Sequence, residues 1–379
     1  MKSAHHTDET GYILMMLKIT RFALLLALLS LASVAWGQQS DDDTQEWTEE
    51  EVAAFFAQDA APDLPTAHRL DGITYHAQWW NNCGPATLTM ALSYFGYSED
   101  QGRAANWLKP NREDKNVSPW QMVEFVNTQV TELPVYSLKR YGGDLTRIKS
   151  LVHAGFPVII EVGYDPDRAA QGWMGHYLLM TGWDDAQGVI YTMDSYDGAN
   201  LPYSYDHIET HWQHFNYVYM VLYEGGDEPR LLELLGDDAD MQQNYINAFY
   251  AAREEAIADE TDAFAWFNMG SMLTELGRYE DAARAFDRAR EIGLPWRMMW
   301  YQFAPYTAYI ETGRYDEVIE LARTIIDNSG GNVEESFYYA GIARYHMGEY
   351  DRARDNFRQV VNYNPNFTSA QEWLNRLGN

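Results

Sequence analysis

The chain has 379 residues, which is long enough for two domains. Its composition is 46% hydrophobic and 15% aromatic, which suffices to fill folded cores and is too apolar for a disordered protein. The formal net charge is -29 at pH 7. Such a surface repels nucleic acid and anionic membranes, so we exclude both as partners.

Residues 1–37 have the pattern of a secretory signal peptide. A basic start precedes an apolar run over 22–35, and small residues follow at the cleavage positions. The run is too short for a membrane span, so we expect no integral span in the mature chain. Translation would then start at Met15 or Met16, and the alternative is an uncleaved N-terminal anchor. The pattern predicts an exported protein, which is periplasmic, on the cell surface or extracellular.

The middle of the chain has a mixed pattern of helices and strands. Residues 38–70 are acidic and are predicted to be a solvated linker with one short helix near 52–58. A mixed domain then fills 71–224. Its predicted strands cover 157–162, 177–183, 189–193 and 217–223, with a turn at 184–188. Two glycines and a proline follow at once, and they predict a second linker over 225–235.

Residues 236–379 are predicted to be helical and repetitive. A glycine, a charged residue and a tyrosine recur at Gly277, Gly313 and Gly348, which are 36 (313−277) and 35 (348−313) residues apart. This period resembles that of tetratricopeptide repeats, which have two helices in about 34 residues. Such units stack, because one unit cannot bury its own apolar face. The repeats are a candidate surface for a protein partner.

The repeats differ in how well they keep the family's packing positions. The small and large positions hold Gly270 and Phe286 in the first unit, and Gly341 and Phe357 in the third. The second unit is degenerate, because Tyr306 replaces the small glycine and Pro305 is expected to interrupt the first helix. A final helix over 368–377 would cap the stack.

Cys83 is the single cysteine, and it stands where a helix is predicted to begin. A lone cysteine has no partner for an intramolecular disulfide, so it is either a buried apolar group or a reactive thiol. Pro85 suits the first turn of a helix, and Leu88, Leu92 and Phe95 follow at helical spacing. The N-terminus of a helix favours thiolate over thiol, which indicates a nucleophile.

His176 is the candidate base, and Asp194 is the candidate group that orients it. If Trp183 pairs with Gln187 across the predicted turn, the histidine lies directly opposite Asp194. If Trp183 pairs with Val189, the two are diagonal neighbours. Both registers place them on one face, where opposed Cβ atoms are about 5 Å apart. A single bulge would instead place them on opposite faces.

Two groups near the start of the helix could stabilise an oxyanion. The backbone N–H of Cys83 is one, and the side-chain amide of Gln78 is the other. Asn81 and Asn82 compete for the same role. Together these residues would supply the nucleophile, base, orienting group and oxyanion donors that acyl transfer by a thiol needs.

These motifs resemble the peptidase C39-like family, the papain-fold cysteine peptidases related to bacteriocin leader-processing domains. The resemblance covers about 73–222, and rests on Gln78 with Asn81-Asn82-Cys83-Gly84-Pro85-Ala86, Gly175-His176-Tyr177 and Asp194-Ser195-Tyr196. It implies Cys83 as nucleophile, His176 as base, Asp194 as orienting group and Gln78 as oxyanion donor. Ser195 stands where the family often has proline. The predicted fold is an α+β papain-like cysteine peptidase domain followed by an all-α tetratricopeptide solenoid.

Each of these residues also has a purely structural interpretation. Cys83 could be a buried structural cysteine, His176 a core histidine, and Asp194 the cap of a turn. Gln78 is the weakest assignment, because asparagines compete with it. The list of candidates also includes His207, His211 and His214, whose spacing could hold a metal on a helix, although we favour a solvated loop there and expect no metal and no other cofactor.

The sequence predicts a thiol hydrolase that cleaves peptide bonds in a peptide or protein substrate through Cys83, His176 and Asp194. One alternative is a non-catalytic peptide- or protein-binding module on a vestigial papain-like scaffold. Another is a transglutaminase or acyltransferase with the same triad, because a triad does not choose between water and an amine as acceptor.

Overall fold

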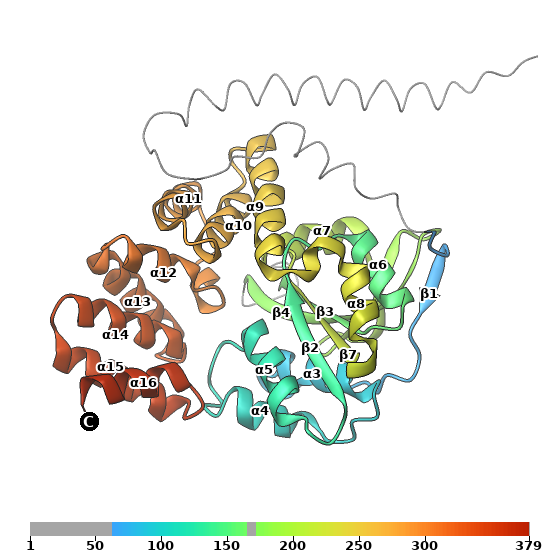
Figure 1. The fold of residues 1–379 in the computed structure, drawn as a ribbon, viewed down its shortest axis with the longest axis horizontal. Coiled ribbons are helices and arrows are strands. Elements are labelled where there is room, and N and C mark those ends of the chain that lie inside the picture. The colour runs from blue at the N-terminus through green and yellow to red at the C-terminus, as the bar shows by residue number, and fades with distance from the viewer. Residues whose placement is uncertain (1–62, 165–171, 379) are drawn as a thin grey trace, which may run out of the picture. The chain divides into compact units, whose positions relative to one another are not determined.

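The computed structural model describes residues 63–164 and 172–378 (Figure 1). The predicted signal peptide, most of the acidic segment and its short helix lie outside the described residues. Within the described part of the chain, no helix is both long and apolar enough to cross a bilayer.

One antiparallel sheet forms the centre of the first domain. Its strands are β1 (Ala67–Arg69), β2 (Val135–Arg140), β3 (Val158–Tyr164), β4 (Met174–Asp184), β5 (Val189–Asp194), β6 (Gly198–Ser204) and β7 (Tyr219–Glu224). The strand order is β2-β7-β3-β4-β5-β6, and β1 pairs with β4. The predicted strands are therefore present, with different ends.

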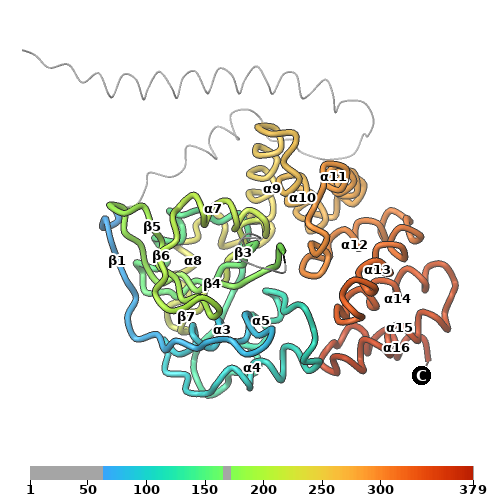
Figure 2. The backbone as a smooth tube through the Cα atoms, turned by 180° about the vertical axis from the view of Figure 1, so that it is seen from behind, coloured from blue at the N-terminus to red at the C-terminus, as the bar shows by residue number. Residues whose placement is uncertain are grey.

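Helices cover both faces of this sheet (Figures 1 and 2). One face carries α3 (Cys83–Ser93), α4 (Gln101–Leu108) and α5 (Pro119–Gln129), and the other carries α6 (Leu145–His153), α7 (Tyr205–Gln213) and α8 (Glu228–Leu235). Successive residues of a strand point to opposite faces. Ile159 accordingly packs in the core beneath α3, while Ile160 packs in the core on the α7 side. The sheet is therefore apolar on both faces.

Two segments predicted as linkers are structured. Residues 67–69, within the predicted acidic linker, form β1. Residues 225–235 begin with a short 3-10 turn, η1 (Gly225–Asp227), and continue as α8, whose Leu231 and Leu235 are fully buried against the sheet. The linker prediction at 225–235 is wrong, because Pro229 lies in the first turn of a helix, where it is tolerated, rather than breaking one.

The rest of the described chain is helical. After the 3-10 turn η2 (Gly236–Ala239) comes α9 (Met241–Ala258), and then three helix pairs and a last helix. The pairs are α10 (Ala263–Glu275) with α11 (Tyr279–Ile292), α12 (Ala304–Glu311) with α13 (Tyr315–Ser329), and α14 (Glu334–His346) with α15 (Tyr350–Tyr363), followed by α16 (Thr368–Leu377). The last helix has the predicted bounds.

Close packing or a positive φ explains why glycine stands at particular positions of the repeats. A Cβ on Gly270 would lie 2.8 Å from the Phe286 ring, and one on Gly341 would lie 2.7 Å from the Phe357 ring. The helices of the first and third pairs therefore touch only because these positions have no side chain. The glycines that set the period end the first helix of each pair with positive φ, which is +74° at Gly277, +72° at Gly313 and +79° at Gly348.

The second pair departs from this pattern. Its first helix, α12, has 8 residues, against 13 in α10 and in α14. The preceding stretch, 293–303, contains only a 3-10 turn, η3 (Met298–Trp300). Pro305 lies in the first turn of α12 and so does not interrupt it, which corrects the sequence prediction. Tyr306 is fully buried at the position that a glycine would occupy, and its ring stacks on Tyr339.

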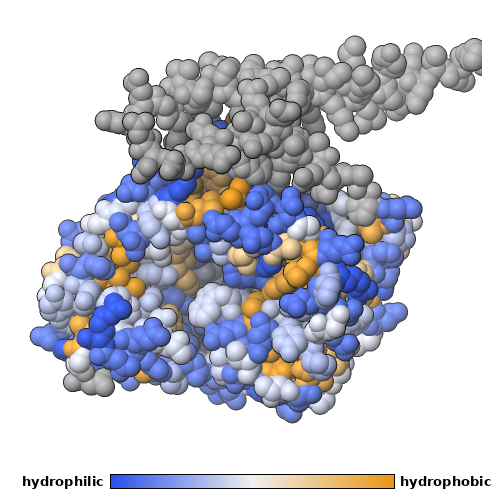
Figure 3. Space-filling model, in the orientation of Figure 1, coloured by the Kyte–Doolittle hydropathy of each residue, from blue (hydrophilic) through white to orange (hydrophobic). Residues whose placement is uncertain are grey.

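Several polar contacts join the repeats to the sheet domain. The Asn244 side chain accepts from the backbone N–H of Tyr141 at 2.9 Å and donates to the carbonyl of the same residue at 2.9 Å. The Lys115 N–H donates to the carbonyl of Asn332 at 3.0 Å. Trp173 and Phe215 of the first domain share an apolar core with the repeats. Hydrophilic residues cover most of the face drawn in Figure 3, in keeping with the net charge.

Candidate active site

Cys83 is the first residue of α3, and Asn82 precedes it as the N-cap. The N–H groups of the first turn of a helix have no acceptor within the helix, so they face the thiol. Gly84 allows the sheet to lie close behind, because a Cβ there would be 3.3 Å from Val117 and 3.4 Å from the Tyr177 ring. The thiol is half-buried. Cys83 is thus held at a helix N-terminus, as predicted from the sequence.

His176 and Asp194 share one face, although not through either predicted turn pairing. Trp183 pairs with Ile190, which is the odd register that would separate the two side chains. A bulge between Met180 and Gly182 then shifts the ladder by one residue, and Asp194 pairs with Leu178. The histidine and the aspartate are therefore diagonal neighbours, as in the second of the two predicted registers.

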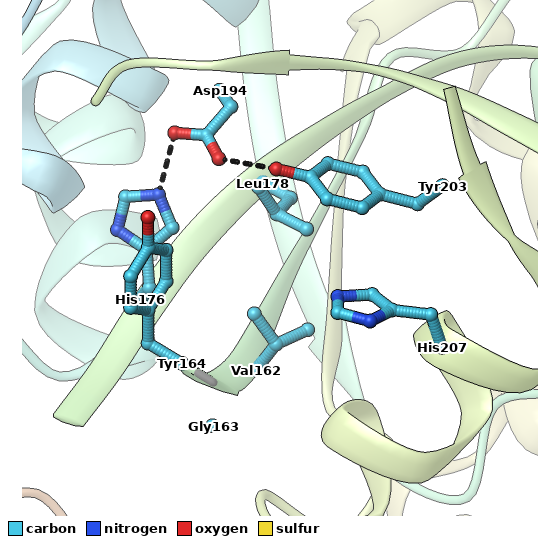
Figure 4. Close-up of a pocket in the computed structure, with 8 residues that line it drawn as sticks. All are labelled: Val162, Gly163, Tyr164, His176, Leu178, Asp194, Tyr203 and His207. Atoms are coloured by element: carbon cyan, nitrogen blue, oxygen red, sulfur yellow. Dashed lines mark hydrogen bonds and ion pairs between the residues drawn. The ribbon is translucent and has the colours of Figure 1, made fainter. Parts of the chain in front are cut away.

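The His176–Asp194 pair is buried and hydrogen-bonded. Nε2 of His176 lies 2.8 Å from Oδ1 of Asp194, and the aspartate is fully buried (Figure 4). The same carboxylate accepts from the backbone N–H groups of Tyr196, at 2.8 Å, and Asp197, at 3.1 Å. The hydroxyl of Tyr203 donates to its other oxygen at 2.9 Å. Four donors therefore hold the carboxylate in its charged form.

The remaining ring nitrogen of His176, Nδ1, is the one available to the thiol. The thiol of Cys83 lies close enough to the His176 ring for each group to shift the pKa of the other. Tyr164 packs edge-on against the imidazole, with 5.2 Å between ring centroids, and Figure 4 shows it beside the histidine. The structure thus brings Cys83, His176 and Asp194 together at one site.

The charges and burial of Cys83, His176 and Asp194 favour an ion pair between the thiol and the imidazole. Burial raises the pKa of Cys83, but the hydrogen bond and charge of His176, together with the charge of Lys109, outweigh it, and the pKa is lowered. Burial lowers the pKa of His176, but Asp194 overrides this effect and raises that pKa to about 10. Burial acts to raise the pKa of Asp194, but His176 and the backbone N–H groups lower it to about 2. The shifts of Cys83 and His176 are both in the direction that favours a thiolate paired with an imidazolium.

Gln78 lies at this site with its amide oriented by a serine. The hydroxyl of Ser195 donates to Oε1 of Gln78 at 2.9 Å, which leaves the amide N–H groups as donors toward the cavity. Its two sequence competitors are bound elsewhere. Asn81 donates its side-chain amide to the carbonyl of Asp114, and Asn82 donates to Gln101. Ser195, the residue that departs from the family pattern, thus orients the predicted oxyanion donor.

A cavity of about 580 Å³ opens beside the thiol. Cys83, His176 and Gln78 line it, and so do Trp300 and Tyr301 of the repeats. Gly175 permits this approach, because a Cβ there would lie 2.9 Å from the Tyr301 ring. The repeats therefore contribute a wall to the pocket that contains the thiol.

The three clustered histidines have structural surroundings. The segment is helix α7 rather than the predicted loop. His207 stacks on Tyr203, and His214 accepts from the indole N–H of Trp173 at 3.1 Å. Burial and His211 lower the pKa of His214 to about 3. Within 63–164 and 172–378, no group of three or more His, Cys, Asp or Glu side chains is arranged to hold a metal ion.

Sequence reasoning missed Tyr203, Ser195 as the partner of Gln78, and the wall from the repeats. Tyr203 carried no signal, because its contact with Asp194 follows from the pairing of β5 and β6. The wall has one signal in the sequence, because the repeats are rich in Trp and Tyr, a pattern that by itself indicates packing. The aromatic stretch around Trp296 and Trp300 precedes the irregular second repeat.

Comparison with known families agrees with this organisation. Residues 70–220 match the peptidase C39-like family, and residues 263–293 and 335–366 match tetratricopeptide repeats. The chain carries a peptidase C39-like domain followed by tetratricopeptide repeats. The C39-like domain contains every residue that we assigned to the site from the sequence. The second repeat lies between the two matched ones.

Several solved structures are similar to about two fifths of the chain. A C39-like peptidase from Bacillus anthracis is 17% identical, with a TM-score of 0.34, and the match covers 41% of this chain and 97% of that one. MamA from Desulfovibrio magneticus RS-1 is 14% identical, with a TM-score of 0.30, over 40% of this chain and 94% of that one. YrrB, a tetratricopeptide protein with an unusual peptide-binding site, is 15% identical, with a TM-score of 0.31, over 39% and 73%. A search of curated proteins found no significant match.

Proposed function

We propose that the C39-like domain is a cysteine peptidase that cleaves peptide bonds through Cys83, His176 and Asp194. One observation carries this proposal. The thiol at the start of α3 lies beside an imidazole that is hydrogen-bonded to a buried carboxylate, and the thiol and the imidazole line one cavity. Nucleophile, base and orienting group in contact are the arrangement that activates a thiol.

The reaction follows from the protonation states. The Cys83 thiolate attacks the carbonyl carbon of the peptide, and the negative charge moves to the carbonyl oxygen. The backbone N–H of Cys83 and the side-chain amide of Gln78 donate to that oxyanion. As the carbon–nitrogen bond breaks, His176 gives its proton to the leaving amine. Water then attacks the thioester and loses a proton to His176, which releases the acid and restores the thiol–imidazole pair.

Asp194 acts through the histidine rather than on the substrate. Its Oδ1 holds Nε2 of His176, so Nδ1 is directed at the thiol. Because Tyr203 and two backbone N–H groups also bind this carboxylate, the imidazole has little freedom to turn. The base is therefore oriented before substrate arrives.

We further propose that the protein is exported and that its repeats bind protein. Export is supported by the N-terminal sequence pattern, which lies outside the described residues. A role for the repeats in substrate binding is supported by Trp300 and Tyr301, which line the cavity of the thiol. Fractionation of cells and N-terminal sequencing of the mature chain would test export.

The proposed activity is tested with a peptide library. The full mature chain is incubated with mixed-sequence peptides, and cleavage is followed by mass spectrometry. We expect cleavage by the parent and none by Cys83→Ala, with retention of cleavage in Ser93→Ala, whose hydroxyl lies at the far end of α3. Equal product from parent and Cys83→Ala would refute the proposal.

Two outcomes would favour the other functions with the same residues. A poised thiolate reacts with iodoacetamide well below the ordinary thiol pKa of about 8.5. Alkylation that rises only above that pH would favour a non-catalytic binding module. Transfer of the acyl group to an added primary amine, in preference to water, would favour a transglutaminase or acyltransferase.

A further inference from the structure

Glu161 is a buried carboxyl in the pocket of the thiol, and the proposed reaction does not use it. It lies on β3, two residues from Ile159, and so points to the same face of the sheet as α3. Only 3% of its surface is exposed, yet it lines the same cavity as Cys83 and His176. Its partner across the ladder is Tyr177. A buried carboxyl group therefore forms part of the lining of a pocket that also carries several Trp and Tyr side chains.

The surroundings of Glu161 do not stabilise a negative charge. Burial raises its pKa well above the ordinary value, and the charge of Cys83 raises it further. The Tyr177 hydroxyl beside it lowers the pKa, but more weakly, and donates its own proton to the carbonyl of Val117 at 2.6 Å. The pocket therefore favours the neutral form of Glu161, and a cation bound beside it would favour the ionised form.

Two basic residues, Arg297 and Lys115, also line the cavity. Arg297 donates to the carbonyl of Trp173 at 3.2 Å, and its guanidinium lies over the rings of Trp296 and Trp300, 4.3 and 5.1 Å from their centroids. The charge of Lys115 opposes, without overcoming, the burial that raises the pKa of the neighbouring Asp114. Neither is among the charges that shift the pKa of Glu161.

Building on the proposed peptidase activity, we propose that Glu161 is the anionic floor of a subsite for a lysine or arginine side chain next to the scissile bond. Trp79 and Trp80 at the rim are 50% and 71% exposed, and they offer apolar surface to the stem of such a side chain. The net charge of -29 also attracts cationic peptides. Glu161 contacts the substrate without taking part in bond cleavage.

Binding at this subsite is coupled to a proton. The cationic side chain enters already charged, Glu161 loses its proton to solvent, and the two form an ion pair. The titratable groups that face Glu161 are Cys83 on α3, Tyr177 on β4 and Tyr301 of the repeats. Cys83 is removed in the experiment below, and the two tyrosines remain neutral because burial raises their pKa values. Cationic peptides should therefore bind more tightly as pH rises from 5 to 8.

The experiment uses binding, so that it does not depend on turnover. Full-length Cys83→Ala is titrated with two alanine hexapeptides that differ only in one central residue, lysine or norleucine, and tryptophan fluorescence is the readout. We expect the lysine peptide to bind about tenfold more tightly or better. The preference should disappear in Cys83→Ala/Glu161→Gln and persist in Cys83→Ala/Glu113→Gln, which removes an exposed carboxylate of the same charge.

Each outcome separates this subsite from the proposed activity. A preference for lysine that survives Glu161→Gln, or no preference at all, overturns the subsite even if peptides are cleaved. A preference that depends on Glu161 supports the subsite even if the parent cleaves nothing, in which case only the peptidase proposal fails. If the Glu161→Gln protein does not fold, calorimetry of Cys83→Ala in phosphate and in Tris buffer decides, because the absence of proton release on lysine binding refutes the subsite.

Discussion

Tyr203→Phe tests whether the hydroxyl of a buried tyrosine holds the orienting carboxylate. That hydroxyl donates to Oδ2 of Asp194 at 2.9 Å, while Oδ1 carries the bond to His176. The tyrosine ring stacks on His207, with 5.0 Å between centroids, and phenylalanine can keep this contact. The substitution therefore removes one donor from a fully buried carboxylate and changes little else.

The magnitude follows from the burial and charge of Asp194. A hydrogen bond to a charged group contributes about 1.5–3 kcal/mol, and its loss here leaves a buried oxygen with one donor fewer. Since 1.4 kcal/mol corresponds to about one pKa unit, the pKa of Asp194 should rise from about 2 by roughly one to two units. Asp194 then stays ionised at pH 7, so we expect kcat to fall by about tenfold at most, through looser orientation of His176.

The pH dependence separates this role from simple packing. The folded pKa of Asp194 lies below its ordinary value of 3.8, so the carboxylate contributes stability above pH 4 that is lost as pH falls through 2. Tyr203→Phe brings the folded pKa closer to 3.8 and makes this contribution smaller. The difference in unfolding free energy between parent and variant should therefore be full at pH 7 and shrink below pH 4.

Urea unfolding of the parent, Tyr203→Phe and Tyr205→Phe measures this difference. Tyr205 is the matched control, because its hydroxyl donates to Asp185 at 2.6 Å on the exposed side of the domain. An exposed pair of this kind contributes about 0–1 kcal/mol. If both variants lose the same small amount, or if the loss does not change between pH 7 and pH 3, Tyr203 does not hold the carboxylate of Asp194.

Three further predictions concern buried acids, the pocket wall and the oxyanion donor. Burial raises the pKa of Glu335 to about 8 and that of Asp114 to about 7, so the stability that the protonated carboxyls provide is lost as pH rises from about 4 to 8. Glu335→Gln should therefore stabilise the chain against urea at pH 9 and not at pH 4. Equal effects at both pH values would contradict this. Gly175→Ala places a Cβ 2.9 Å from the Tyr301 ring, so KM should rise more than kcat falls, and unchanged peptide kinetics would exclude this tyrosine from the pocket. Gln78→Ala should lower kcat about 100-fold or more with KM nearly constant, whereas an effect on KM alone would make the amide a binding group.

The hairpin shows how far sequence periodicity can position two side chains. Alternation along the strands was sufficient to place His176 and Asp194 on one face, given an even register. The turn itself has the odd register, with Trp183 opposite Ile190, and a bulge at Met180 and Gly182 restores the even one. Bulges depend on local backbone packing that the pattern of apolar residues does not encode. The right diagonal pairing was thus predicted, but the turn that would produce it was not.

Residues that join distant segments were beyond the sequence patterns. Cys83 could be placed because a helix start has local signals, and Gln78 because it precedes that start. Tyr203 reaches Asp194 only through the pairing of β5 and β6. Glu161 was read simply as part of a buried strand, because a single acid in an apolar run does not reveal which face it occupies. Long-range packing decides both cases.

The degenerate second repeat has a structural reason that connects the two halves of the chain. A regular first helix at this position would need a small residue where Tyr306 is buried, and it would replace the irregular stretch 293–303. That stretch instead carries Trp300 and Tyr301 to the cavity of Cys83. A repeat stack can accept one shortened helix when the neighbouring pairs remain packed, as the pairs on either side do. The departure from the repeat pattern is therefore the feature that brings the solenoid into the pocket, and the substrate preference of the thiol should change with this stretch more than with either regular repeat.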